Sequence, residues 1–278
     1  MKTVILALTA LALVSCSTLD AVRMLSNASH PSSDSQPAAQ AAPADQAAQA
    51  PAAGGQQAPA GLDAAAKADW ARYSQPAASG KTFGASADLS AAPATTLQPG
   101  AWAVYRSLEN GQVKGIIKLA LVGKQGDAWI YEFASYSDKD SAVVQQAIQG
   151  LDDMVQSGNS DKGKVLWMKV KGKDGKIQTI DGAMLAMAGG AYKGMVTANS
   201  LPPTTTVTAG GPITVPAGTF TSTWKADSQV SQGRNSEPGT SWVSTQVPLW
   251  HLVKAQTKNG NVLELVDFGT SGYQSSMN

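Results

Sequence analysis

The stretch that decides the fold class is Asp127–Ser137, with the sequence DAWIYEFASYS. In an extended chain, successive side chains point to opposite faces. One face of this stretch then carries Trp129, Tyr131 and Phe133, and the other carries Ala128, Ile130 and Glu132. A period of two over this length is typical of a half-buried strand in an antiparallel sheet. We therefore expect a protein built mainly of β-strands.

The same period recurs on both sides of this stretch. In Val165–Lys171, one face carries Leu166, Met168 and Val170, and the other carries Trp167, Lys169 and Lys171. Further strands are predicted at Trp102–Ser107, Lys114–Val122, Thr219–Val230, Thr240–Thr245, Leu252–Lys258 and Val262–Gly269. Turn residues such as Glu109-Asn110-Gly111 and Asn259-Gly260-Asn261 separate several of them. The predicted fold class is mainly β (α+β), with an antiparallel sheet.

Two segments interrupt the strand pattern. From Asp140 to Ser157, apolar residues recur at steps of three and four, and Gly158 follows as a stop signal, which predicts an amphipathic helix across a sheet face. The segment Asp181–Met195 is rich in small residues and methionines and is also predicted as a helix, although Gly189-Gly190 lies in its middle.

The N-terminus predicts export and lipidation. Cys16 is the only cysteine, and it follows Lys2 and the apolar run Val4–Val14, which is shorter than the ~20 residues that span a bilayer. The sequence Leu13-Val14-Ser15-Cys16 resembles the bacterial lipoprotein signal, which implies removal of residues 1–15 and a lipid on Cys16. Ser17, in place of an aspartate, resembles the pattern of proteins sent to the outer membrane. The alternative is an ordinary signal peptide that contains a cysteine.

Composition divides the rest of the chain. Residues 16–99 are predicted to be a lipidated cysteine followed by a tether, because Pro37–Ala60 consists almost entirely of Ala, Gln, Pro and Gly. A short helix is expected at Gly61–Tyr73 around Trp70, and residues 100–278 are predicted to form one antiparallel β domain. The formal net charge of +1 argues against nucleic-acid binding.

Two motifs carry a family resemblance. They are Ile213–Phe220, ITVPAGTF, and Val247–Lys254, VPLWHLVK. They resemble a group of bacterial envelope proteins whose sheet is similar to that of the periplasmic lipoprotein carriers. The resemblance implies a strongly curved sheet, or unclosed barrel, with one or two helices over an apolar concave face that receives acyl chains.

Both motifs also have a structural explanation, because proline and glycine form turns and proline suits strand edges. In the functional alternative, the side chains that line a ligand mouth are Trp242, Leu249 and Trp250. Three methionines, Met184, Met187 and Met195, offer an adaptable apolar surface for acyl chains or a partner, or fill a core.

A basic segment is the most distinctive charged feature. Candidate contacts for anionic headgroups or an acidic envelope polymer are Lys164, Trp167, Lys169, Lys171 and Lys173. The alternative is that these lysines protect an exposed strand against edge pairing.

Signatures of catalysis are few. The histidines are His30 and His251, so a His/Cys metal cluster cannot be assembled, and no cofactor is predicted. Ser222 and Lys225 have the spacing of an acylating pair, but on a strand they point to opposite faces. We expect a non-enzymatic outer-membrane lipoprotein that faces the periplasm and binds a lipid or a lipoprotein acyl chain. The alternatives are a scaffold for another envelope protein and an envelope hydrolase.

Overall fold

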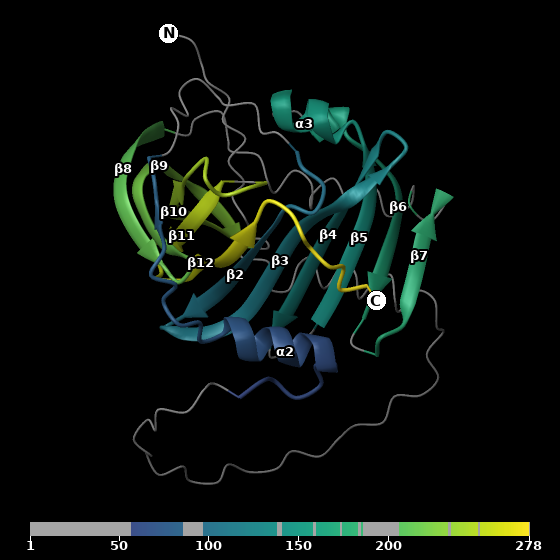
Figure 1. The fold of residues 1–278 in the computed structure, drawn as a ribbon, viewed down its shortest axis with the longest axis horizontal. Helices are drawn as coiled ribbons and strands as arrows, with labels where there is room; N and C mark the ends of the chain where they lie inside the picture. The colour runs from purple at the N-terminus through teal and green to yellow at the C-terminus, as the bar shows by residue number, and fades with distance from the viewer. Residues whose placement is uncertain are drawn as a thin grey trace.

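The computed structural model describes residues 57–85, 97–137, 141–157, 160–172, 174–182, 185, 206–232, 235–249 and 251–277. Their main feature is one 12-stranded sheet in the order β1-β9-β10-β11-β12-β2-β3-β4-β5-β6-β7, with β8 paired to β9. All neighbouring strands are antiparallel except β1 and β9. The predicted fold class, a mainly β protein with an unclosed, curved sheet and helices, is confirmed (Figure 1).

The strands have the following bounds: β1 Thr82–Phe83, β2 Trp102–Glu109, β3 Gln112–Gln125, β4 Ala128–Ser137, β5 Ser141–Gln149, β6 Lys164–Lys171, β7 Ile177–Asp181, β8 Thr206–Val215, β9 Gly218–Gln232, β10 Asn235–Val243, β11 Leu252–Thr257 and β12 Val262–Gly269. The helices are α2 Ala64–Tyr73, α3 Leu151–Ser157 and the 3-10 turn η2 Ser160–Lys162. None of the described helices is long and apolar enough to cross a bilayer.

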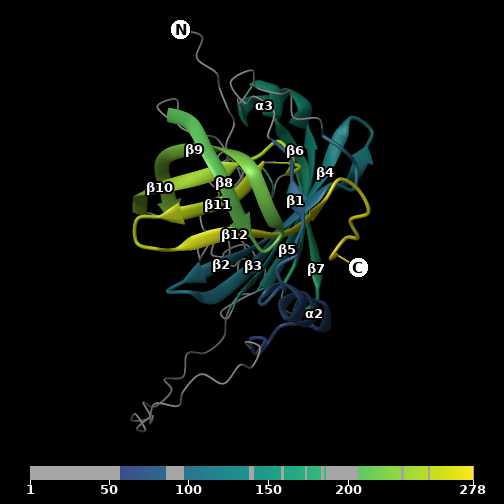
Figure 2. The ribbon, with the colours of Figure 1, turned by 60° about the vertical axis from the view of Figure 1, so that its left-hand side comes forward.

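The sheet curls around a core on its inner face. Tyr105 of β2, Leu119 of β3 and Phe133 of β4 belong to the same apolar cluster as Phe220 of β9 and Leu252 of β11. Strands far apart in the sheet order therefore meet across its inside, and Figure 2 shows β8–β12 folded over toward β2–β7. The alternation predicted for Asp127–Ser137 is confirmed, since Trp129, Tyr131 and Phe133 all face this cluster.

The outer face of the sheet is also covered. Trp70 and Tyr73 of α2 pack against Val104, Ile116 and Tyr136, and Met277 joins this second cluster from the C-terminal segment. Asp63 caps α2, because its Oδ1 accepts a hydrogen bond of 2.7 Å from the Ala66 N–H. The helix predicted around Trp70 is confirmed.

The folded part begins earlier than residue 100. Within the segment predicted to be tether, α2 is packed on the sheet and Thr82–Phe83 pairs with β9. Phe83 stacks on Phe220 with ring centroids 4.6 Å apart and lies 5.1 Å from the Phe268 ring. Residues 57–85 therefore contribute two elements to the domain.

The helix predicted at Asp140–Ser157 is wrong over its first half. Ser141–Gln149 is strand β5, and only Leu151–Ser157 is helical. Every residue from Ser141 to Ile148 is buried, because the sheet is covered on both faces at this point. A strand buried on both sides lacks the alternation that identifies a half-exposed one.

The second predicted helix is contradicted at its first residue, but Gly182 and Leu185, the other residues of its range that the structure describes, are helical. Asp181 ends strand β7, which pairs with β6 in the register Lys171↔Ile177 to Trp167↔Asp181. Most of the remaining range to Met195 lies outside the described residues.

The motif ITVPAGTF forms the β8–β9 hairpin. Its turn lies between Val215 and Gly218, which has a φ of 145°. A Cβ at Gly218 would lie 2.6 Å from the Lys81 carbonyl oxygen and 2.8 Å from the Phe83 ring. Glycine is therefore needed here for close approach of β1, and the structural explanation of this motif is confirmed.

Candidate functional site

The most connected polar group lies on the outer face of β4, where Glu132 is 0% exposed. Its carboxylate accepts hydrogen bonds from Tyr273 Oη at 2.7 Å, the Ser276 N–H at 2.7 Å and Gln145 Nε2 at 3.0 Å. Ser275 Oγ donates a further bond. We call these five residues the Glu132 cluster. Each acceptor oxygen is satisfied, as a buried carboxylate requires.

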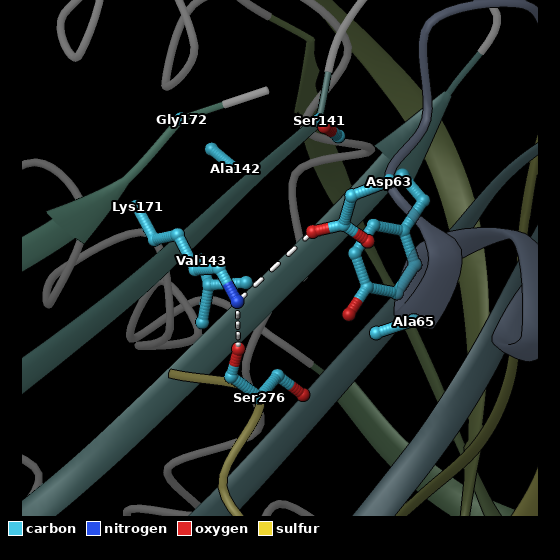
Figure 3. Close-up of a pocket in the computed structure, with 9 residues that line it drawn as sticks. Asp63, Ala65, Ser141, Ala142, Val143, Lys171, Gly172 and Ser276 are labelled. Atoms are coloured by element: carbon cyan, nitrogen blue, oxygen red, sulfur yellow. Dashed lines mark hydrogen bonds and ion pairs between the residues drawn. The ribbon is translucent and has the colours of Figure 1, made fainter. Parts of the chain in front are cut away.

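Two lysines extend this cluster along the sheet. Lys118 Nζ lies 2.6 Å from Asp69 Oδ2 on α2 and 3.2 Å from Ser276 Oγ. Lys171 Nζ donates to the Ser276 carbonyl oxygen at 3.1 Å and lies 4.0 Å from Asp63 Oδ2 (Figure 3). Side chains of β3 to β6 therefore bind the C-terminal segment, which crosses these strands in Figure 1.

A small pocket lies beside this cluster. It is lined by Asp63, Ala65, Tyr136, Ser141, Ala142, Val143, Lys171, Gly172 and Ser276 (Figure 3). Its cavity of ≈ 10 Å³ is close to the minimum for a single water molecule, whereas small-molecule sites take about 300 Å³ or more. The cluster therefore serves to hold the C-terminal segment and α2 against the sheet.

The tyrosines of this region are neutral. Burial raises the pKa of Tyr273 far above its ordinary value, and the nearby Glu132 charge raises it further. Burial likewise raises the pKa of Tyr136. The Tyr273 hydroxyl thus stays protonated and donates a hydrogen bond to the Glu132 carboxylate. A neutral hydroxyl that donates to a buried carboxylate is suited to fixing the C-terminal segment on the sheet.

The two described residues of the predicted ligand mouth, Trp242 and Leu249, are not brought together. Trp242 lies on β10, and its cross-strand neighbours are Lys225 on β9 and Lys254 on β11. Lys254 Nζ is 5.7 Å from the Trp242 ring centroid. Leu249 is 9% exposed and belongs to the inner-face cluster. Trp250 lies outside the described residues. Trp242 is paired on a strand and Leu249 is packed in the core, so the two side chains have separate surroundings.

The motif VPLWHLVK forms the connection from β10 to β11. Leu249 and His251 adopt φ values of 68° and 58°, an uncommon conformation for residues other than glycine. The connection is closed by a hydrogen bond of 2.8 Å from the Ser244 N–H to the His251 carbonyl oxygen. His251 Nδ1 lies 2.7 Å from the Val247 carbonyl oxygen, so Nδ1 carries the proton and donates.

The surroundings of the His251 side chain indicate a structural role. Burial lowers the pKa of its imidazole below the ordinary value of 6.5, which keeps the ring neutral at pH 7. Its imidazole hydrogen-bonds to the backbone of Val247 and Ser244 in its own loop. In the described ranges, His, Cys, Asp and Glu side chains form no group of three or more that could hold a metal ion.

The predicted basic surface is distributed over β6 and its flanks. Trp167, Lys169 and Lys171 share the outer face, with Lys169 Nζ 5.2 Å from the Trp167 ring centroid. Trp167 Nε1 donates to Gln125 Oε1 at 3.0 Å. Lys164 is exposed, whereas Lys171 binds Ser276 and is largely buried. Of the four predicted contacts that the structure describes, Lys164 is therefore exposed at the surface, and Trp167 and Lys169 are half-buried.

Several predicted site residues lie outside the described part of the chain. They are Cys16, Lys173, Met184, Met187 and Met195. Their predicted roles stay predictions.

Sequence patterns missed the Glu132 cluster. The alternation of Asp127–Ser137 places Glu132 opposite the aromatic residues, and an acidic residue in an apolar strand was the available signal. Its partners Tyr273 and Ser276 are 141 and 144 residues away in the chain, and no local pattern connects them.

Comparisons with known proteins give little further information. The sequence matches no protein-family model and no curated protein. Among solved structures, it is similar to one from Bacteroides fragilis that is described as exported and as having a YmcC-like fold. The likeness covers 62% of this chain and 97% of that chain, at 11% identity and a TM-score of 0.28. A likeness with this TM-score supports no functional conclusion.

Proposed function

We propose that this chain is a lipid-anchored envelope protein whose β domain is a non-enzymatic binding module for another envelope protein. The observation that carries this proposal is the filled inner face of the sheet. Tyr105, Phe220 and Leu252 are fully buried there by the chain's own side chains. A domain whose described core is packed in this way acts through its surface.

The filled core also supports one of the two binding functions that the sequence suggests. An acyl chain needs an apolar cavity of several hundred Å³. In the described residues, the corresponding space on the inner face is occupied by Leu119, Leu121, Phe133 and Leu263. This packing favours a protein partner over a lipid or a lipoprotein acyl chain as the ligand.

The polar clusters support a role without catalysis. Glu132 is enclosed by four donors, and His251 donates to the backbone of its own loop. A general base needs an open acceptor beside a bound substrate. These groups instead stabilise the C-terminal segment and the β10–β11 connection.

The anchor follows from the sequence of the leader. Cys16 after an apolar run is the acceptor for the lipid, and Ser17 favours the outer membrane with the domain on its periplasmic side. Metabolic labelling with an alkyne fatty acid tests this step. We expect label on the wild-type chain, and we expect Cys16→Ser to lose the label and leave the membrane fraction. An unlabelled wild-type chain would contradict the anchor.

The binding function is tested in cells by site-specific photo-cross-linking. A photoreactive residue is placed at exposed Thr179, Gln246 or Lys258, and at buried Leu119 for the inner face. We expect a discrete protein adduct from at least one exposed position, at a yield comparable to the amount of the chain. Lipid adducts from position 119, without protein adducts from any exposed position, would show that the apolar-ligand alternative is right.

A further inference from the structure

Strand β7 forms an exposed end of the sheet. In the described part of the chain it pairs with β6 on one side, and no strand pairs with its other edge (Figure 1). Ile177 is 49% exposed, and Gln178, Thr179 and Asp181 are also exposed, so that Ile180 alone of the five residues is buried. Such an edge presents unpaired backbone N–H and C=O groups to solvent.

The edge is short, with five residues, and ends at the charged Asp181, but it lacks three other devices that prevent pairing with another chain. These devices are lysine, proline or a bulge on the edge strand itself. The sequence of β7, IQTID, contains no lysine or proline, and its register with β6 has no bulge. Of the lysines that the sequence suggested as edge protection, Lys164, Lys169 and Lys171 lie on β6, one strand further in, and Lys173 lies outside the described residues. Lys164, Lys169 and Lys171 therefore do not lie on the edge strand itself.

The charge next to the edge selects the type of strand that can be added. Residues 160–182 contain six lysines and three aspartates. Lys169 is the cross-strand neighbour of Thr179, and its Nζ lies 5.2 Å from the Trp167 ring centroid. A strand added to β7 would lie two strands from Lys169 on the same outer face. Acidic side chains in that strand are within reach of the long lysine side chains.

We propose that the free edge of β7 binds an extended, acidic segment of a partner protein as an additional strand. Backbone hydrogen bonds to β7 supply affinity, and acidic side chains on the face of Lys169 supply selectivity. This inference rests on the proposed function, because it names the surface and the partner chemistry of that binding module. A second copy of the chain is disfavoured, since pairing β7 with itself would bring two positively charged hairpins together.

The test uses the full chain in detergent and a fluorescent ten-residue peptide of alternating Glu and Thr. The first control replaces each Glu by Lys. The second control keeps the Glu-Thr sequence but carries N-methyl groups on alternate backbone nitrogens. We expect only the unmodified Glu-Thr peptide to bind in an anisotropy titration, and we expect it to slow amide hydrogen exchange at residues 177–181. The controls need no variant of the protein, so failed folding cannot produce the result.

A matched pair of charge reversals locates the peptide. Lys169→Glu should weaken binding by about tenfold. Lys258→Glu, in the exposed β11–β12 turn, should leave binding unchanged.

Three results would overturn the inference: no binding of the Glu-Thr peptide, equal binding of its N-methylated form, or protection at 177–181 in the free chain because of dimerisation. If the peptide fails while a partner still cross-links in cells at Gln246 or Lys258, the binding function stands and the β7 assignment fails. If no position captures a partner, the binding function fails as well.

Discussion

At the scale of single residues, Glu132 connects distant parts of the chain. It lies on β4, and its donors come from β5 and the C-terminal segment. A fully buried carboxylate is tolerated only when its hydrogen-bonding capacity is used. The strand alternation predicts which face Glu132 occupies, but partners more than 140 residues away follow only from the three-dimensional fold.

Replacement of Glu132 by glutamine tests this connection. Glu132→Gln keeps the size of the side chain, but one acceptor oxygen becomes an amide that faces the donors Ser275 Oγ and Gln145 Nε2. We expect the free energy of unfolding to fall by about 2–3 kcal/mol in urea titrations. The exposed Glu109→Gln control should change it by less than about 0.5 kcal/mol. Equal stability of the two variants would rule out an anchoring role for Glu132.

His251 predicts a pH dependence of stability. Because burial lowers its pKa in the folded state, the unfolded chain takes up a proton more readily near the ordinary value of 6.5. The contribution of neutral His251 is therefore complete above pH 6.5 and decreases as the pH falls below that value. We expect the free energy of unfolding of the wild type to decline in this range.

The matched variant for His251 is asparagine. Its amide can replace the Nδ1–H donor to Val247, and asparagine tolerates the positive φ of this position. His251→Asn should lack the part of the decline that begins near pH 6.5, while keeping the carboxylate titration at lower pH. Parallel pH profiles for the two proteins would show that His251 does not titrate on unfolding.

At the scale of elements, prediction succeeded where one face of a strand differs from the other. Strands β4 and β6 were predicted from Trp129, Tyr131 and Phe133 and from Leu166, Met168 and Val170. Strand β5 was missed, because Val143 packs on the outer face while Val144 and Ile148 are buried on the inner side. Val144, Ala147, Ile148 and Leu151 then have helical spacing by coincidence.

The junction between β5 and α3 depends on Gly150. It has a φ of 74°, and a Cβ there would collide with the Lys162 carbonyl oxygen. Gly126, in the β3–β4 turn, has a φ of 61° and open space around the same position. Gly126→Ala should therefore cost only about 1–2 kcal/mol of backbone strain.

Gly150→Ala adds a steric clash with the backbone to this strain, so we expect a loss of about 3 kcal/mol or more. Urea titration of both variants measures the difference. Equal stability of Gly150→Ala and Gly126→Ala would contradict the close approach of the 162–163 backbone to Gly150.

At the scale of the whole molecule, the covered sheet links structure to the proposed function. The fold class could be predicted from strand alternation. The contacts between strands that are far apart in the sequence could not. The pairing of β1 with β9 and of β12 with β2 joins segments more than 100 residues apart, and the packing of Phe83 against Phe220 and Phe268 follows from that pairing. The sequence therefore suggested a concave ligand face, whereas the described inner face is packed with side chains.

Native mass spectrometry of the full chain, extracted from the envelope in mild detergent, tests the central claim most directly. We predict one covalently lipidated chain in a stoichiometric complex with a protein, and no lipid that is released from the β domain at higher collision energy. Release of a bound lipid from a chain without a protein partner would contradict the account.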